Sequence, residues 1–239
     1  MKVRIAGITD LSTIDWPGKL ATVVFFQGCN LRCPWCQNAD CVPPDGGKIA
    51  DTAEVVEHIK KLAPITDGVM LSGGEPTLQP KAALAVLKGA KERSLSCAME
   101  TNGTNPEALN QLLPYLDFVA IDVKAPLQDP ELYDRATGSV GVSARRIRES
   151  LVLAVASGKE VEARTTIVPT LNDSPETIAR LAAGIKDVPC LRLQPFRNQR
   201  TLDPGFQNLP PITEKKMDEI VRAALDEVRN VKISTGGRP

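Results

Sequence analysis

The sequence lacks an excess of either charge, and it lacks a long apolar run. Its 29 Lys and Arg residues balance its 29 Asp and Glu residues, whereas a chain that neutralises nucleic-acid phosphates is usually basic. No apolar run approaches the roughly 20 residues that a membrane span requires, and residues 1–10 lack the apolar core of a signal peptide. We therefore expect a cytoplasmic protein that binds neither nucleic acid nor membrane.

Internal repeats, low-complexity tracts and linkers are also missing, so we expect the 239 residues to form one domain. Its core is expected at about residues 15–200, with a C-terminal helix and tail at about 205–239. The six cysteines do not resemble a disulfide framework, because three of them lie within eight residues. In a reducing compartment, such crowding indicates metal binding or catalysis.

Apolar segments alternate with helical patterns along most of the chain. Residues 21–27 read ATVVFFQ, a run without polar alternation that is typical of a strand buried on both faces. Further strands are predicted at 68–71, 96–101, 118–123, 161–168 and 191–196, and helices at 51–62, 80–93, 106–113, 145–156, 175–185 and 213–228. This alternation predicts parallel βα units. About six units are too few for a complete barrel, so we predict an α/β fold, a partial (β/α)6 barrel.

Polar motifs follow the predicted strands at the point where each strand ends. In chain order they are GCNLRC, SGGEP (72–76), ETNG (100–103) and DVK (122–124), with Arg164 inside the fifth strand and Arg197 after the sixth. Ligands of parallel α/β folds bind at the carboxyl ends of the strands. The convergence of these motifs predicts one binding site at that end of the sheet.

The three crowded cysteines, Cys29, Cys33 and Cys36, have the spacing C-x3-C-x2-C. Thiolates suit iron–sulfur clusters, and three of them can hold three irons of a cubane and leave the fourth iron open. The alternative is a structural zinc site with Cys41 as fourth ligand, although zinc sites usually pair two cysteine knuckles and this chain has one. The single histidine, His58, falls in a predicted helix and is interpreted as a solvated residue.

This cysteine spacing after a first strand, with Trp35 just before the last cysteine, resembles the radical S-adenosylmethionine (radical SAM) superfamily. The stretch 14–38, IDWPGKLATVVFFQGCNLRCPWCQN, is similar to the activating enzymes of glycyl radical enzymes, most closely to the activating protein of anaerobic ribonucleotide reductase. GGK at 46–48 and the SGGEP, ETNG and DVK motifs occur in the same order. No second cysteine cluster is present, so a single cluster is expected.

The resemblance implies a [4Fe–4S] cluster on the three cysteines and SAM bound to the open iron through its amino and carboxylate groups. One electron from the reduced cluster would break the C5′–S bond, giving methionine and a 5′-deoxyadenosyl radical. In an activating enzyme that radical takes a hydrogen atom from a backbone glycine of a partner, which becomes a glycyl radical enzyme. The implied electron donor is of the flavodoxin or ferredoxin type.

By the same resemblance, Gly73 and Gly74 line the methionine end of SAM, where a backbone without side chains lets a ligand approach closely. Glu75 is the expected acceptor for the SAM ammonium group. Asp122 and Lys124 are two residues apart on a strand and share a face, and the resemblance places them near the ribose and carboxylate. Without the resemblance, GGEP could be an ordinary turn and the Asp122–Lys124 pair a surface ion pair.

Arg164 could meet the SAM carboxylate with two parallel hydrogen bonds. Glu100 and Thr101 lie where some activating enzymes bind a monovalent cation, although the formate-lyase activator has Asp in place of Glu100. Arg197 stands where that activator has His. With Trp35 and Gln37 near the adenine, the residues expected at the cofactor are Trp35, Gln37, Gly73, Gly74, Glu75, Glu100, Thr101, Asp122, Val123, Lys124, Arg164 and Arg197.

Two other functions remain open, a radical SAM enzyme that acts on a small molecule and a non-enzymatic metal-binding protein. Trp16 replaces the first Gly of the DGPG motif of the formate-lyase activator, and it either packs near the barrel mouth or contacts a partner. Cys97 and Cys190 fall in predicted strands, where a buried cysteine acts as a small hydrophobic residue.

Overall fold

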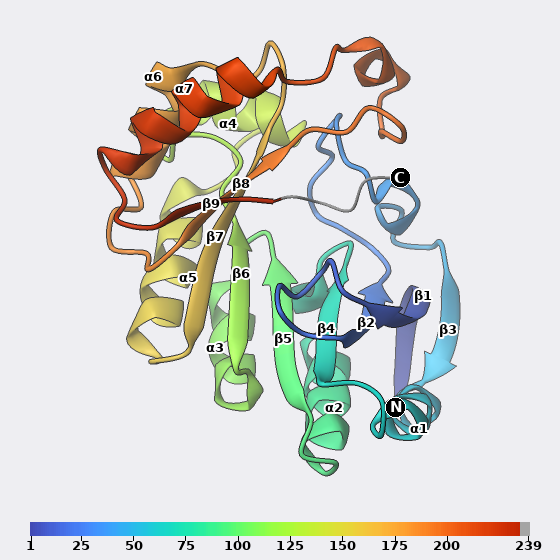
Figure 1. The fold of residues 1–239 in the computed structure, drawn as a ribbon. Helices are drawn as coiled ribbons and strands as arrows, with labels where there is room; N and C mark the ends of the chain where they lie inside the picture. Colours follow the sequence, from blue (N-terminus) through green and yellow to red (C-terminus); the bar gives the residue numbers. More distant parts are fainter. Residues whose placement is uncertain (235–239) are drawn as a thin grey trace.

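One mixed sheet forms the core of the structure, a computed structural model that describes residues 1–234. Within these residues, nine strands lie in the order β3-β1-β2-β4-β5-β6-β7-β8-β9 (Figure 1). The six predicted strands are adjacent to one another and run parallel. They are β2 (Ala21–Phe26), β4 (Gly68–Gly73), β5 (Ser96–Thr101), β6 (Phe118–Asp122), β7 (Glu160–Ile167) and β8 (Leu191–Pro195). The predicted α/β fold with six parallel strands in an incomplete barrel is confirmed, and the antiparallel strand β1 makes the sheet as a whole mostly parallel.

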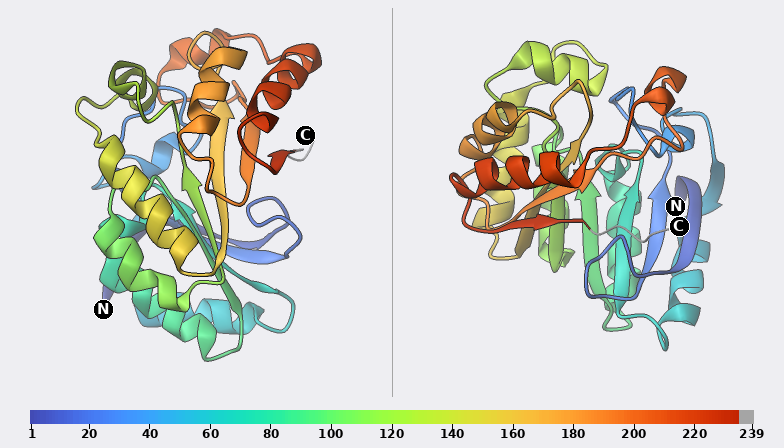
Figure 2. Two further views of the ribbon diagram at one scale, coloured as in Figure 1. Left: turned by 90° about the vertical axis from the view of Figure 1, so that its left-hand side faces the viewer. Right: turned by 45° about the horizontal axis from the view of Figure 1, so that its top comes forward.

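Helices pack against one face of this sheet, the outer face (Figure 2). The opposite, inner face borders a cavity. They are α1 (Thr52–Leu62), α2 (Pro80–Lys91), α3 (Pro106–Leu112), α4 (Pro130–Thr137), α5 (Ala144–Ala156), α6 (Pro175–Ala183) and α7 (Glu214–Leu225). Short 3-10 turns lie at Ala39–Cys41, Pro76–Leu78, Leu113–Tyr115 and Pro204–Asn208. The sequence predicts every one of these helices except α4, whose eight residues bury only Tyr133, Ala136 and Thr137.

Local interactions explain where the helices begin. The Asp51 side chain accepts a hydrogen bond from the Ala53 N–H at 3.2 Å, and Glu54 reaches back to the Asp51 N–H at 3.2 Å. This capping box satisfies donors that the first turn of α1 would otherwise leave unpaired. Val55 and Ile59 then fall on the face of α1 that packs on the sheet. No helix within residues 1–234 is long and apolar enough to cross a membrane.

Three strands lie outside the predicted set. Strand β1 (Lys2–Ser12) pairs antiparallel with both β2 and β3 (Lys48–Asp51). Its mixed sequence buries little beyond Val3 and Ile5, so it gives no continuous apolar signal. Strand β9 (Val231–Ile233) extends the sheet beside β8. Residues 235–239 of the predicted tail lie outside the described residues.

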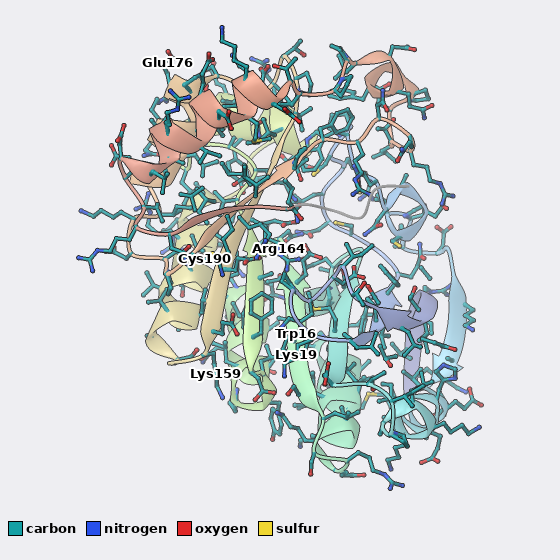
Figure 3. All side chains as sticks on the ribbon, viewed as in Figure 1. Trp16, Lys19, Lys159, Arg164, Glu176 and Cys190 are labelled. Carbon is teal, nitrogen blue, oxygen red and sulfur yellow. The ribbon has the colours of Figure 1, made fainter. Side chains whose placement is uncertain are left out.

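The inner face carries a small apolar cluster of its own. It consists of Trp16, Ala21, Val23, Met70, Ala98, Phe118 and Ala120. Trp16 belongs to the β1–β2 loop, residues 13–20, which crosses the inner face (Figure 3). Its ring stacks on Phe118 at 5.8 Å between centroids, and only 4% of the residue is exposed. Of the two interpretations of Trp16, packing is therefore the one that the structure confirms.

Candidate active site

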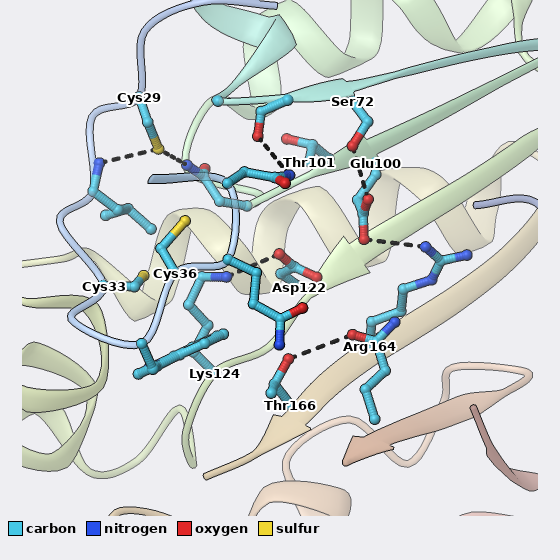
Figure 4. A pocket seen from close by; sticks show the side chains of 18 of the residues that line it. Cys29, Cys33, Cys36, Ser72, Glu100, Thr101, Asp122, Lys124, Arg164 and Thr166 are labelled. Atoms are coloured by element: carbon cyan, nitrogen blue, oxygen red, sulfur yellow. Dashed lines mark hydrogen bonds and ion pairs between the residues drawn. The ribbon is translucent and has the colours of Figure 1, made fainter. Parts of the chain in front are cut away.

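A cavity of about 520 Å³ lies on the inner face, where the parallel strands end (Figure 4). The predicted site residues that line it are Cys29, Cys33, Trp35, Cys36, Gln37, Gly73, Gly74, Glu100, Thr101, Asp122, Lys124, Arg164 and Arg197. Glu75 and Val123 do not line it. The strand-end motifs, far apart in the sequence, thus meet in one place, as parallel topology requires.

The cysteine loop follows β2 and forms one wall of the cavity. The Cys36 N–H donates to the Cys33 carbonyl at 3.0 Å, which closes a tight turn between the last two cysteines. The Arg32 N–H donates to the Thr137 carbonyl at 2.9 Å and so ties the loop to the end of α4. Because of these bonds, Cys29, Cys33 and Cys36 all present their thiols to the same cavity.

Burial raises the pKa of all three thiols, for Cys33 to about 12, and Lys124 acts against this rise. The Lys124 ammonium lies 2.8 Å from Asp122 Oδ2 and 5.1 Å from the centre of the Trp35 ring. Burial disfavours its charge, but Asp122 and Cys33 outweigh burial and hold its pKa well above the usual value. Because only 8% of Lys124 is exposed, the Asp122–Lys124 pair is no surface ion pair. It brings both charges to the edge of the cysteine loop.

Both glycines of the SGGEP loop are required by the protein backbone itself. A Cβ on Gly73, whose φ is +111°, would lie 2.5 Å from the Phe26 backbone, and one on Gly74 would lie 2.2 Å from the Gly28 carbonyl oxygen. The Gly74 N–H donates to the Phe26 carbonyl, and the Glu75 N–H donates to the Gly28 carbonyl, both at 2.8 Å. The two glycines line the cavity as expected, and they also let the β4 loop press against the cysteine loop.

Glu75 departs from its expected place. The residue is fully buried, and its carboxylate accepts hydrogen bonds from Thr101 Oγ1 and the Asn102 N–H at 2.7 Å and from Thr77 Oγ1 at 2.6 Å. These internal donors occupy both oxygens, so the side chain fastens the ends of β4 and β5 together instead of lining the cavity. Val123 is likewise turned into the protein, where its N–H donates to the Arg164 carbonyl at 2.8 Å.

Arg164 lines the cavity, but its guanidinium is held by internal acceptors. Nε donates to Glu162 Oε1 at 2.9 Å, Nη1 to Glu100 Oε1 at 3.1 Å, and Nη2 to the Asp15 carbonyl at 3.1 Å. Ser72 Oγ donates to the other oxygen of Glu100 at 3.0 Å. The expected two-pronged contact of Arg164 with a SAM carboxylate therefore differs from the arrangement seen, in which Arg164 joins three parts of the protein.

Sequence reasoning missed several polar residues of the cavity, among them Asn38, Asn102, Thr166 and Gln194. Thr166 lies two residues after Arg164 on β7, and this two-residue period was a usable signal. The supporting pair of Glu162 and Arg192, whose Nε lies 2.7 Å from Glu162 Oε1, gave no such signal. It depends on the register between β7 and β8.

The remaining cysteines do not line the cavity. Cys41, Cys97 and Cys190 are buried, with 7%, 0% and 7% of each exposed, and for Cys97 and Cys190 this confirms the expected burial. His58 is partly exposed, and its Nε2 lies 2.7 Å from Asp10 Oδ1. Within residues 1–234, no group of three or more His, Cys, Asp or Glu side chains is arranged to hold a single metal ion.

A mostly parallel open sheet with three cysteines at one cavity is a combination that can be compared with known protein families. The sequence profile of the Radical SAM superfamily matches residues 23–182. A structure of a radical SAM methyltransferase from Sphaerobacter thermophilus shares the fold with a TM-score of 0.70 and 16% identity, over 92% of this chain and 68% of that one.

Proteins with similar sequences indicate which group within the radical SAM superfamily this chain resembles. A Methanocaldococcus jannaschii protein assigned as a glycyl-radical enzyme activating enzyme is 33% identical over 237 residues, which cover 98% of this chain and 97% of its own. The pyruvate formate-lyase-activating enzyme of Clostridium pasteurianum is 37% identical over 190 residues, 77% of each chain. The chain therefore belongs to the glycyl-radical enzyme activating enzymes of the radical SAM superfamily.

Proposed function

We propose that this chain generates a glycyl radical on a partner enzyme, and that the partner is an anaerobic ribonucleotide reductase. The observation that carries the proposal is the meeting of three thiols with the Asp122–Lys124 ion pair in one cavity at the strand ends. The family supports the class of reaction, and the similarity of residues 14–38 supports this partner. A flavodoxin- or ferredoxin-type protein is the proposed electron donor.

The residues of the cysteine loop fit an iron–sulfur cluster by donor type. Cys29, Cys33 and Cys36 would each hold one iron, and the fourth would remain for SAM. A cluster held by these three cysteines would supply the one electron needed to cleave SAM at its sulfonium, and the radical so formed would take a hydrogen atom from the partner glycine. The protein's part is to bind, orient and shield the reactants.

The ion pair suits the zwitterionic end of SAM. Lys124 offers a charged donor and Asp122 a charged acceptor 2.8 Å away, so a ligand with both signs can pair with each. Trp35 fixes the pair from one side, because its Nε1 donates to the Ala136 carbonyl at 2.8 Å and its ring faces the ammonium. Arg164 already sets a positive charge 3.1 Å from Glu100, so we propose no additional monovalent cation at Glu100 and Thr101.

The test is anaerobic incubation of the reconstituted protein with a reductant, SAM and the partner, followed by electron paramagnetic resonance. We expect a glycyl doublet with the native chain and none with Cys29→Ala, Cys33→Ala or Cys36→Ala, which should also lose iron and SAM cleavage. The matched control is Cys97→Ala, because Cys97 does not line the cavity. This variant should keep its iron, its SAM cleavage and the glycyl doublet.

The alternatives give different results in the same experiments. SAM cleavage without a glycyl doublet, tried with every glycyl radical enzyme of the source organism, would instead favour a small-molecule substrate. A purified chain with zinc but neither iron nor sulfide would eliminate both enzymatic functions.

A further inference from the structure

Cys29 differs from an isolated thiol because two N–H groups point at its sulfur. The Leu31 N–H lies 3.4 Å from Cys29 Sγ, and Asn102 Nδ2 lies 3.9 Å from it (Figure 4). The first donor belongs to the cysteine loop itself. The second comes from the end of β5, which is 73 residues further along the chain, and Asn102 also lines the cavity.

The orientation of the Asn102 amide is fixed by its neighbours. Its Oδ1 accepts from the Thr104 N–H at 3.0 Å and from Thr104 Oγ1 at 2.7 Å, while its Nδ2 donates to Asn30 Oδ1 at 2.9 Å. Turning the amide over would set its NH2 group against the Thr104 N–H and its oxygen against Asn30 Oδ1. The NH2 group therefore lies on the side of Cys29, with one hydrogen on Asn30 Oδ1 and the other directed at Cys29 Sγ.

The backbone of Asn102 is fastened as well. Its N–H donates to Glu75 Oε2 at 2.7 Å, and only 5% of the residue is exposed. Glu75, which does not line the cavity, takes part in this network, because it holds the strand end from which the Asn102 amide reaches Cys29. In a buried setting such hydrogen bonds are stronger than in water.

Hydrogen bonds to cysteine sulfur are one of the means by which a protein sets the reduction potential of an iron–sulfur cluster. Reduction adds one electron and so makes the thiolates more negative. An N–H dipole directed at sulfur stabilises that added charge and raises the potential. A donor lost from Cys29 makes the cluster harder to reduce.

We propose that Asn102 is a positioning residue that tunes the cluster held by the three cysteines, by directing its amide N–H at Cys29 Sγ. The inference rests on the proposed function only in that the chain carries the cluster. It needs neither SAM nor the partner enzyme, and the electron is supplied by any low-potential one-electron reductant.

The test is a redox titration of the reconstituted full chain without SAM, followed by electron paramagnetic resonance of the reduced cluster. Asn102→Ala removes the donor, and Asn102→Asp also adds a negative charge. At the reductant potential that half-reduces the native cluster, we expect the ratio of reduced to oxidised cluster to fall about tenfold in Asn102→Asp, which is about 59 mV for one electron. The fall in Asn102→Ala should be smaller and of the same sign.

Asn105→Asp is the matched control, because it makes the same change of amide to carboxylate three residues away. Its side chain caps α3 and donates to the Thr77 carbonyl instead of a cysteine. We expect its potential and its iron content to equal those of the native chain. Native potentials in both Asn102 variants, at native iron content, would overturn the proposal.

Thr104→Val covers the case in which the Asn102 variants lose iron. It keeps Asn102 but removes the Oγ1 donor that orients the amide, so we expect a smaller shift to lower potential; an unchanged potential would overturn the proposal. A shifted potential together with no glycyl radical on any partner would leave this inference standing and refute the proposed function.

Discussion

The inner face of the sheet has two halves that are stabilised by opposite means. Below the β1–β2 loop, β2 to β6 present the apolar cluster under Trp16. Beside it, β7 and β8 present Glu162, Arg164 and Arg192, each less than a tenth exposed. The apolar half stabilises the fold because apolar surface is removed from water. The charged half is tolerated only because every charge has a partner, and its contribution depends on keeping all of them.

Arg164 lies on the border between the two halves and serves both. Its guanidinium carbon is 5.7 Å from the centre of the Phe118 ring, which also stacks on Trp16. Its donors reach Glu162 on one side and the Asp15 carbonyl of the loop on the other. The difference between the halves shows that Arg164, which lines the cavity, is held by charge pairing, whereas the region under Trp16 is held by apolar packing.

The largest effect is expected from Glu162→Ala. It leaves Arg192 buried without its carboxylate and removes one of the three acceptors of Arg164, so the free energy of unfolding should fall by about 3 to 5 kcal/mol. Urea unfolding followed by circular dichroism measures the loss. Glu160→Ala, an exposed position on the same strand, should change it by less than about 0.5 kcal/mol. Equal results for the two variants would show that the charged half is not held by pairing.

Trp16→Ala tests the apolar half. Removing the indole opens a cavity over Phe118 and Met70, and the free energy of unfolding should fall by about 3 kcal/mol. Lys19→Ala, on the exposed part of the same loop, is the control. If thermal and urea unfolding were unchanged in Trp16→Ala, the loop would not be part of the folded core.

The two halves should also differ in their response to acid. Burial disfavours the Glu162 charge, but Arg192 and Arg164 outweigh burial and lower its pKa below the usual 4.5. This contribution to stability is fully present above about pH 4.5 and is lost as pH falls through the lowered folded pKa. Urea unfolding between about pH 3 and 7 should therefore show a flatter acid limb for Glu162→Gln, whereas Trp16→Phe should keep the native slope. Parallel curves for Glu162→Gln and the native chain would contradict this assignment.

The smallest effect is expected from Cys190→Ala, which borders the charged half. Its sulfur lies 3.7 Å from Glu162 Oε2 and is a weak donor, so we expect a loss of about 1 kcal/mol or less. Iron content after reconstitution should equal that of the native chain. A loss of iron would show that the charged half reaches the cluster.

The sequence could predict those parts of the fold that have a continuous signal. Apolar runs such as residues 21–27 identified the six parallel strands, and topology then brought the strand-end motifs together. Strands β1 and β9 were missed because each buries few side chains and depends on a neighbouring strand. Pairing with the neighbouring strand decides where each of them begins and ends, and the local sequence does not encode that pairing.

The candidate site shows the same division. Residues that line the cavity, such as Asp122 and Lys124, follow from motif and strand period. Glu75 could not be placed correctly, because two of its donors, Thr101 and Asn102, lie 26 and 27 positions away at the end of another strand. The Glu162–Arg192 pair likewise depends on register across β7 and β8, and a charged residue in a buried strand gives no sign of its partner.

The contacts that close the cysteine loop determine when, during synthesis of the chain, the site can form. The loop that carries the three cysteines is held by residues far along the chain: Gln37 Nε2 donates to the Arg197 carbonyl, 160 residues away, and the Asp203 N–H donates to the Pro34 carbonyl. Because synthesis proceeds from the N-terminus, the thiols exist long before these contacts can form. The cysteine loop therefore reaches its final position only after residue 203 has been synthesised, because a segment made much later holds it there.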